Sequence, residues 1–115
     1  MVERLVTVVE TAQFLRRAKA VGLADAERAE LVTALASDPA AGVPLGGGLY
    51  KMRFGRPGGG KSGGWRVLHF YRRQDLPVFL LSVFGKNEKA NISTAERAAL
   101  ISLCDLIAEA YGRRA

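Results

Sequence analysis

The hydrophobic period changes twice along this chain, and no other feature of the sequence limits its fold as strongly. Between residues 11 and 37 apolar side chains recur every three or four positions, as they do on one face of a helix. Over residues 49–84 they alternate with polar side chains, which is typical of strands. The helical period returns over residues 93–111. The sequence therefore predicts an α+β fold, with two helices, an antiparallel sheet and a final helix in that order.

Local residue chemistry predicts the ends of the first elements. Residues 4–10 are rich in β-branched side chains and predict a strand before the helices. Thr11 is a suitable N-cap for a helix that ends at Gly22. The second helix is predicted to start at Ala24 or Asp25 and to end before Asp38 and Pro39, so that the two helices form a hairpin.

The middle of the chain is predicted to form a meander. Residues 40–48 are interpreted as a loop, because Pro44 and three consecutive glycines fit neither period. Three alternating segments follow, LYKMRF, GWRVLHFYRR and LPVFLLSVF, and predict three antiparallel strands. Ser93 and Glu96 then have the spacing of a capping box, which marks the start of the last helix. The apolar stripe of this helix is predicted to consist of Ala99, Leu100, Leu103, Leu106, Ile107, Ala110 and Tyr111.

The length of 115 residues fits a single domain, residues 1–115, whose core needs neither disulfides nor metal. The one cysteine, Cys104, cannot form an internal disulfide, and its apolar helical surroundings predict a buried thiol. Acidic side chains near the N-terminus argue against a signal peptide. The sequence contains no run of 18 apolar residues, so a membrane span is not expected either. We therefore expect a cytoplasmic protein without membrane association.

The net charge of +6 is concentrated in the middle of the chain. Residues 41–90 contain nine cations and two acids, whereas residues 1–40 have a net charge of −1 and the remainder is neutral. Proteins bind phosphates through clustered Lys and Arg, so this distribution predicts a polyanionic partner. The alternative is that these cations are only solvated by water and bind no partner.

The stretch GRPGGGKSGG, residues 55–64, matches the phosphate-binding loop of nucleotide triphosphatases letter for letter. In such a loop the phosphates lie on backbone amides and on the N-terminus of a helix that starts directly after the Lys–Ser pair. Here Lys61 and Ser62 are followed by two glycines and by WRVLHFYRR, which has the composition of a strand. The stretch is therefore interpreted as a hairpin loop rather than as the site of an ATPase.

Strand alternation places several cations near one another. Lys51 and Arg53 share one face of their strand, and Arg66 begins the next strand, directly after the loop that carries Lys61. One face of the last strand is predicted to hold Leu80, Ser82, Phe84 and Lys86, and the other Phe79, Leu81 and Val83. We expect the cations to meet at one edge of the sheet, with the helices packed against the opposite face.

Such a cluster suits single-stranded RNA, because cations bind phosphates and an aromatic ring stacks on a base. Repulsion between the cations lowers the pKa of a lysine, so that a lysine could serve as a general base. An arginine cannot, and would instead stabilise charge on phosphate oxygens. The expected cluster consists of Lys51, Arg53, Lys61, Arg66 and Lys86, beside Phe84.

Two other titratable residues are predicted to have structural roles. Glu88 lies among cations in KNEKAN and is interpreted as their counter-charge, with a general base as the alternative. His69 is interpreted as a packed side chain rather than a catalytic one, because it shares its alternating face with apolar residues. No cluster of His, Cys or acids has the spacing of metal ligands, so we expect no metal and no other cofactor.

Four segments together resemble the RelE/HigB group of bacterial toxin–antitoxin toxins: GGGLYKMRF, GKSGGWRVLHFY, FLLSVFGKNEKANIS and AERAAL. The order of elements agrees over nearly the whole chain. The resemblance implies a RelE-like fold and a ribosome-dependent endoribonuclease that cuts mRNA in the ribosomal A site and inhibits translation. It also implies a cognate antitoxin, which holds the toxin inactive in a hetero-oligomer. In such enzymes the ribose 2′-hydroxyl attacks the adjacent phosphate without a metal.

Carried over by position, the resemblance assigns roles to individual residues. Arg66 contacts the phosphate with Arg53 beside it, Phe84 stacks on a base, and either Lys61 or Lys86 is the general base. The remaining RNA contacts are assigned to Lys51, Ser62 and Lys89. Some family members have a tyrosine near the last strand, and because Phe84 has no hydroxyl, the group that protonates the leaving oxygen stays open.

Two other functions also stay open. The same fold resembles ParE-type toxins, which inhibit DNA gyrase by binding it and perform no RNA chemistry. The presence of Lys61 and Arg66 favours the nuclease over this alternative. The third alternative is an RNA-binding module without catalytic activity.

Overall fold

The computed structural model describes residues 5–55, 64–85 and 92–112. Within these ranges the elements are, in chain order, β1 (Val8–Glu10), α1 (Ala12–Val21), α2 (Asp25–Ser37), β2 (Val43–Gly46), β3 (Leu49–Phe54), β4 (Trp65–Phe70), β5 (Val78–Gly85) and α3 (Thr94–Gly112). The strands form one sheet in the spatial order β1-β5-β4-β3-β2. Strand β1 runs parallel to β5 and the other neighbours are antiparallel, so the α+β class and the predicted meander of β3, β4 and β5 are confirmed.

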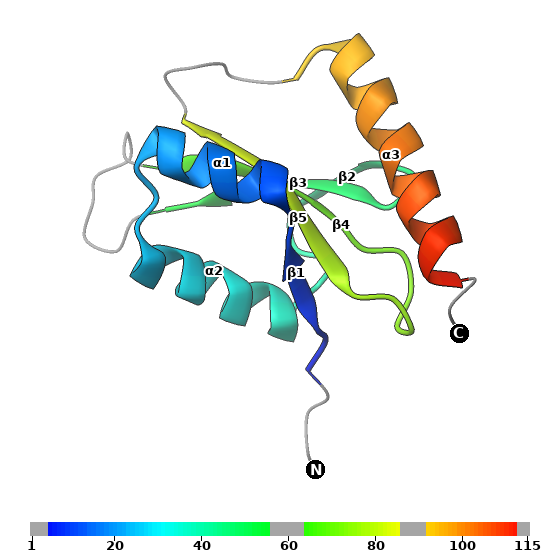
Figure 1. The fold of residues 1–115 in the computed structure, drawn as a ribbon, viewed down its shortest axis with the longest axis horizontal. Coiled ribbons are helices and arrows are strands. Elements are labelled where there is room, and N and C mark those ends of the chain that lie inside the picture. Colours follow the sequence, from blue (N-terminus) through cyan, green and yellow to red (C-terminus); the bar gives the residue numbers. More distant parts are fainter. Residues whose placement is uncertain (1–4, 56–63, 86–91, 113–115) are drawn as a thin grey trace.

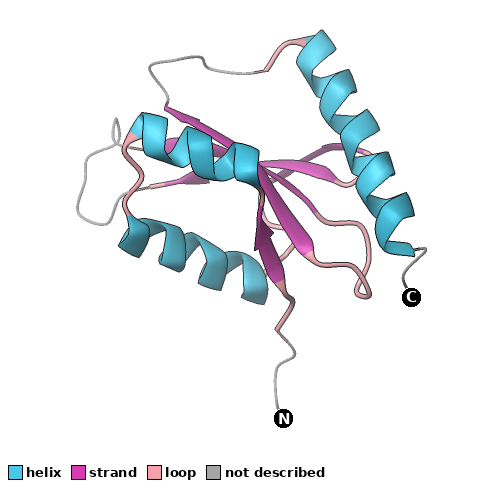
Figure 2. Cartoon of the chain, viewed as in Figure 1, coloured by secondary structure: helices cyan, strands magenta, loops and turns pink. Residues whose placement is uncertain are grey.

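Helices α1 and α2 lie antiparallel on one side of the sheet, and α3 lies on the other (Figure 1). Figure 2 shows the same three layers coloured by secondary structure. The two helical layers create two separate buried clusters, one under the α1–α2 hairpin and one under α3. The expectation that all helices pack on one face of the sheet is therefore wrong for α3.

The start of α1 is fastened to the last strand. The Thr11 hydroxyl accepts a hydrogen bond from the amide of Phe14 at 3.2 Å, which confirms the predicted N-cap, and donates to the Leu80 carbonyl at 2.7 Å. One turn further along, Arg17 Nε donates to the Val83 carbonyl at 3.1 Å. Because β1 pairs only with residues 78–80 of β5, the bond from Arg17 satisfies a carbonyl on the part of the strand edge that β1 leaves uncovered.

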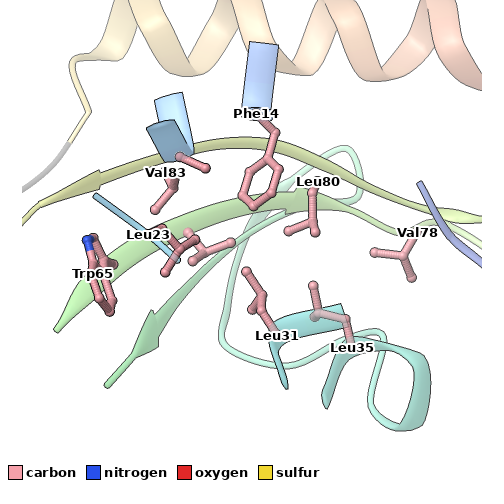
Figure 3. Packing of buried hydrophobic residues seen from close by; sticks show 10 residues of the cluster. Phe14, Leu23, Leu31, Leu35, Trp65, Val78, Leu80 and Val83 are labelled. Atoms are coloured by element: carbon pink, nitrogen blue, oxygen red, sulfur yellow. The ribbon is translucent and has the colours of Figure 1, made fainter. Parts of the chain in front are cut away.

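The cluster under the hairpin is built from residues at helical spacing. Phe14 points from α1 toward Leu80 of the sheet, and Leu31 and Leu35 approach the same region from α2 (Figure 3). All four side chains are fully buried. Removing each from water stabilises the fold by about 1.5–3 kcal/mol before the loss of chain entropy is counted. Gly22 ends α1 in the left-handed conformation with φ of 79°, as predicted.

Residues predicted to form a loop contain strand β2, so that prediction is wrong. Val43 pairs with Lys51 and Pro44 with Tyr50, in an antiparallel hairpin with β3. A proline is tolerated here because β2 is the edge strand of the sheet, where one row of backbone amides has no partner strand. The three glycines after it all have positive φ and form the tight connection to β3.

Helix α3 begins with the predicted capping box. The Ser93 hydroxyl accepts from the Glu96 amide at 3.1 Å, and the Glu96 carboxylate accepts from the Ser93 amide at 3.0 Å. The apolar stripe is rotated from the predicted one, because Leu103 and Leu106 are 42% and 64% exposed. The side chains that pack toward the sheet are Leu100, Ile101, Cys104, Ile107, Ala108 and Tyr111. Cys104 is fully buried, as expected, and burial raises the pKa of its thiol to about 11.

A register shift in β5 overturns the predicted strict alternation of that strand. Leu68 of β4 pairs with Ser82, but the next residue pairs with Leu80, so that Leu81 is an extra residue. Beyond this bulge, Phe84 lies in the cluster under α3 and Leu80 in the cluster under the hairpin. Phe79 and Leu81 therefore lie on the same face as Phe84, not opposite it, whereas Leu80 faces the other way.

Candidate nucleic-acid interface

Two arginines stand directly opposite each other on adjacent strands. Arg53 of β3 pairs with Arg66 of β4, and Arg66 in turn pairs with Phe84 of β5. Directly opposed residues in an antiparallel pair have Cβ atoms about 4.5–5.5 Å apart. All three side chains leave the sheet on the α3 side, since they alternate with residues of the cluster under the hairpin.

Lys51 lies on the same face, one row further along. It is two residues before Arg53 in β3 and pairs with Leu68 of β4 and with Val43 of β2. Arg53 is exposed, whereas Lys51 and Arg66 are half-buried. The structure thus brings together Lys51, Arg53 and Arg66, and this group is called the basic face below.

In the part of the chain that the structure describes, neither Arg53 nor Arg66 forms an ion pair with a carboxylate. The ion pairs seen there join Arg28 with Glu10 and Asp25, Arg72 with Asp105, and Arg73 with Asp75. Like charges that face each other across a strand pair are destabilising. An opposed pair of arginines without a carboxylate therefore favours the binding of an anion.

Phe84 does not offer the exposed ring that base stacking requires. It is 2% exposed and belongs to the cluster under α3, together with Leu68 and Leu81. The reason is that α3 crosses the face of the sheet that was expected to be open. The expectation of an exposed aromatic platform at Phe84 is therefore wrong for this conformation.

Five of the predicted site residues are not placed on this surface. Lys61 and Ser62 in residues 56–63, and Lys86, Glu88 and Lys89 in residues 86–91, lie outside the described residues. Their assigned roles stay predictions.

His69 is packed inside the protein, as the sequence predicted. Its side chain is fully buried, its Nε2 lies 3.2 Å from the Pro39 carbonyl oxygen, and its ring stacks on Tyr50 with centroids 5.3 Å apart. Burial lowers the pKa of the imidazole to about 4. As a neighbour of Leu68 in β4, His69 lies on the side opposite the basic face, which separates it from any chemistry there.

Sequence reasoning missed Arg97, in the first turn of α3. Its Nε donates to the Leu45 carbonyl at 2.8 Å, and Nη2 donates to the same oxygen. Arg97 and Lys51 both line a hollow of about 250 Å³ beside the basic face. A signal was present in the sequence, because a cation just after a capping box opposes the helix dipole and is unfavourable there.

A larger groove separates the start of α1 from α3. It has a volume of about 530 Å³ and a mostly apolar lining, and its floor is formed by Leu68, Leu81, Ser82 and Phe84.

Among the described residues, no group of three or more His, Cys, Asp and Glu is arranged to hold a metal ion. In the same part of the chain, no helix is long and apolar enough to cross a membrane.

The chain is similar to a known protein family and to a solved structure. A family model described as the RelE toxin of the RelE/RelB toxin–antitoxin system matches residues 6–113. The structure of a mutant of E. coli toxin RelE in the free state superposes with a TM-score of 0.52 and 17% sequence identity. The match covers 75% of this chain and 88% of that chain, and at this identity it establishes similarity of fold.

Proposed function

The chain belongs to the family of RelE toxins of toxin–antitoxin systems, and from this premise we propose that it is an endoribonuclease that cuts mRNA on the ribosome and thereby inhibits translation. The observation that carries the proposal is the directly opposed pair Arg53–Arg66, in which Arg53 is exposed and Arg66 is half-buried. No other described surface places two arginines opposite each other on neighbouring strands.

The proposed reaction uses the RNA's own nucleophile. The ribose 2′-oxygen loses its proton to a base and forms a bond to the adjacent phosphorus. The bond from phosphorus to the 5′-oxygen of the next nucleotide breaks, and that oxygen takes up a proton. The products are a 2′,3′-cyclic phosphate and a 5′-hydroxyl, and no water, metal or redox partner is consumed.

The arginines are suited to the charge that develops in this reaction. The attacked phosphate gains negative charge on its non-bridging oxygens, and a guanidinium presents donors in a planar fork that matches two such oxygens. Arg66 and Arg53 would hold that charge from adjacent strands, whose rigid pairing fixes their positions. Neither can transfer the proton, because the pKa of arginine is too high.

Proton transfer is therefore assigned to two lysines outside the described residues. Lys61 or Lys86 would take the 2′-proton, since neighbouring cations lower the pKa of a lysine. Lys51, Ser62 and Lys89 would bind the RNA backbone. Phe84 has no hydroxyl and cannot protonate the leaving 5′-oxygen. We propose that this buried side chain supports Arg66, with which it pairs, instead of stacking on a base.

We also propose that a cognate antitoxin holds the toxin inactive in a hetero-oligomer. An acidic antitoxin segment over the basic face would neutralise the opposed arginines and exclude mRNA at the same time.

The test is to incubate the purified protein with translating ribosomes in the presence of EDTA and to map the new mRNA ends. We expect cuts at fixed positions within codons, with 2′,3′-cyclic phosphate and 5′-hydroxyl ends. Arg66→Ala should abolish the cuts. Lys19→Gln, an equal loss of charge on the exposed side of α1, should not.

Three results would contradict the proposal in different ways. Intact mRNA together with inhibited DNA supercoiling would identify a gyrase inhibitor. RNA that is bound but never cut would identify a binding module. Ends with a 3′-hydroxyl and a 5′-phosphate would show that water, not the ribose, is the nucleophile.

A further inference from the structure

The hollow at the start of α3 combines two cations from elements that are distant in sequence. It is lined by Leu45 of β2, Lys51 of β3, and Ile92, Ser93, Thr94 and Arg97 at the helix start. Its volume of about 250 Å³ is sufficient for a phosphate group. It adjoins the basic face through Lys51, which belongs to both.

The guanidinium of Arg97 is held in place by the protein. Two of its five N–H donors are used on the Leu45 carbonyl, through Nε and Nη2, and the others remain for a further acceptor. Fixing the side chain beforehand lowers the entropy lost when an anion binds. Within residues 5–55, 64–85 and 92–112 no acidic side chain forms an ion pair with Arg97.

The carboxylate of the capping box does not line this hollow. Glu96, the acid nearest to Arg97 in the helix, has its carboxylate on the Ser93 amide and lines the apolar groove rather than this hollow. Among the described residues, the lining of the hollow thus contains the cations Lys51 and Arg97 and no acidic side chain.

We propose that Lys51 and Arg97 bind the phosphate of a nucleotide next to the one that is cut, which rests on the proposed cleavage of RNA at the basic face. Lys51 and Arg53 are two residues apart, which corresponds to about 7 Å along β3. This separation is comparable to the spacing of neighbouring phosphates in an extended single strand. The RNA backbone then runs from the Arg53–Arg66 pair along β3 to the start of α3, and Arg97 is a positioning residue.

Salt dependence of RNA binding separates this role from a structural one. A single-stranded oligoribonucleotide with 2′-O-methyl groups cannot be cut, so its dissociation constant can be measured across a salt series. Each phosphate contact to a single strand contributes about −0.7 to the slope of log K against log salt. The double variant Lys51→Gln/Arg97→Gln should flatten the slope by about 0.7, which is one phosphate. Arg97→Gln alone should flatten it by part of that amount.

Two control variants make the result specific. Arg97→Lys keeps the charge but loses the fork on Leu45, and should restore the slope even if its Tm is lower. Lys19→Gln removes one charge from α1, on the other side of the sheet, and should leave the slope unchanged. An unchanged slope in Arg97→Gln would overturn the proposal. A slope that is flatter by about 1.4 in the double variant would also overturn the proposal, because it would indicate contacts to two separate phosphates.

The outcomes also separate this proposal from the proposed function. If the wild-type protein cuts mRNA and Arg97→Gln binds RNA with the wild-type slope, the second phosphate site is wrong and the nuclease stands. If the wild-type protein neither binds the oligonucleotide in a salt-dependent way nor cuts mRNA, both are wrong.

Discussion

Replacing Arg53 by Glu should make the protein more stable while it removes the proposed activity. In the wild-type protein Arg53 stands opposite Arg66, and like charges in this position are destabilising. A glutamate would convert the repulsion into attraction. Cross-strand charge pairs contribute about 0.2–1 kcal/mol, so losing the repulsion and gaining an attraction should together raise the free energy of unfolding by about 0.4–2 kcal/mol. Because Arg53 is exposed, the lower half of that range is expected.

The assay is urea unfolding of three proteins at about 0.1 M and about 1 M salt, where the Debye lengths are about 10 Å and about 3 Å. Arg53→Gln is the matched control, because it removes the repulsion without adding attraction. At low salt the free energy of unfolding should be highest for Arg53→Glu, intermediate for Arg53→Gln and lowest for wild type. These differences should shrink at high salt. A gain of 1 kcal/mol should also raise Tm by about 4 °C.

Both variants should lose mRNA cleavage although they are more stable, which rules out unfolding as the cause of inactivity. A glutamate variant that is less stable than the glutamine variant at low salt would refute the reasoning. So would differences that do not change with salt, because they would mean that the two arginines do not face each other.

Two further predictions concern the scaffold. Gly42→Ala should lower the free energy of unfolding by more than about 1 kcal/mol, because φ is +96° and the new Cβ would lie 2.3 Å from the Lys51 carbonyl oxygen. The control in the same urea titration is Gly55→Ala, at a position with open space and no positive φ. Equal losses of stability in the two variants would contradict the prediction. Burial lowers the pKa of His69 to about 4 in the folded protein, whereas its ordinary value is 6.5. As the pH is lowered, the unfolded chain is therefore protonated first. The free energy of unfolding should fall by about 1.4 kcal/mol per pH unit between pH of about 6.5 and about 4. His69→Gln should flatten this pH profile, and an unchanged profile would assign the titration to another group.

The parts of the fold that depend on local chemistry could be predicted from the sequence. The period of two over residues 49–54 gave the bounds of β3 and correctly placed Lys51 and Arg53 on one face. The caps at Thr11 and Ser93 were recognisable because one side chain satisfies one nearby backbone amide. Each of these features involves residues that are close together in the chain.

The errors concern features that depend on distant partners. Strand β2 exists because β3 provides a partner for it, and Pro44 is acceptable only because the strand is at the edge. The bulge at Leu81 depends on the register with β4, which local alternation cannot reveal. Helix α3 has apolar residues on several sides, so its sequence did not define which of them face the sheet.

The same distinction explains the candidate site. The opposed arginines were predictable, because antiparallel pairing of two consecutive strands brings their facing residues together. The burial of Phe84 and the position of Arg97 were not, because both depend on α3 crossing the face that carries the basic residues.

The most direct measurement is the single-turnover rate at which the protein cuts mRNA bound to stalled ribosomes, compared between wild type and Arg66→Ala. Removing one preorganised donor to developing charge typically lowers a rate by about 10²–10³-fold. We therefore predict a loss of at least about 10²-fold for Arg66→Ala, with Lys19→Gln cutting at the wild-type rate. Equal rates for wild type and Arg66→Ala would contradict the claim that the opposed arginines of the sheet perform the chemistry.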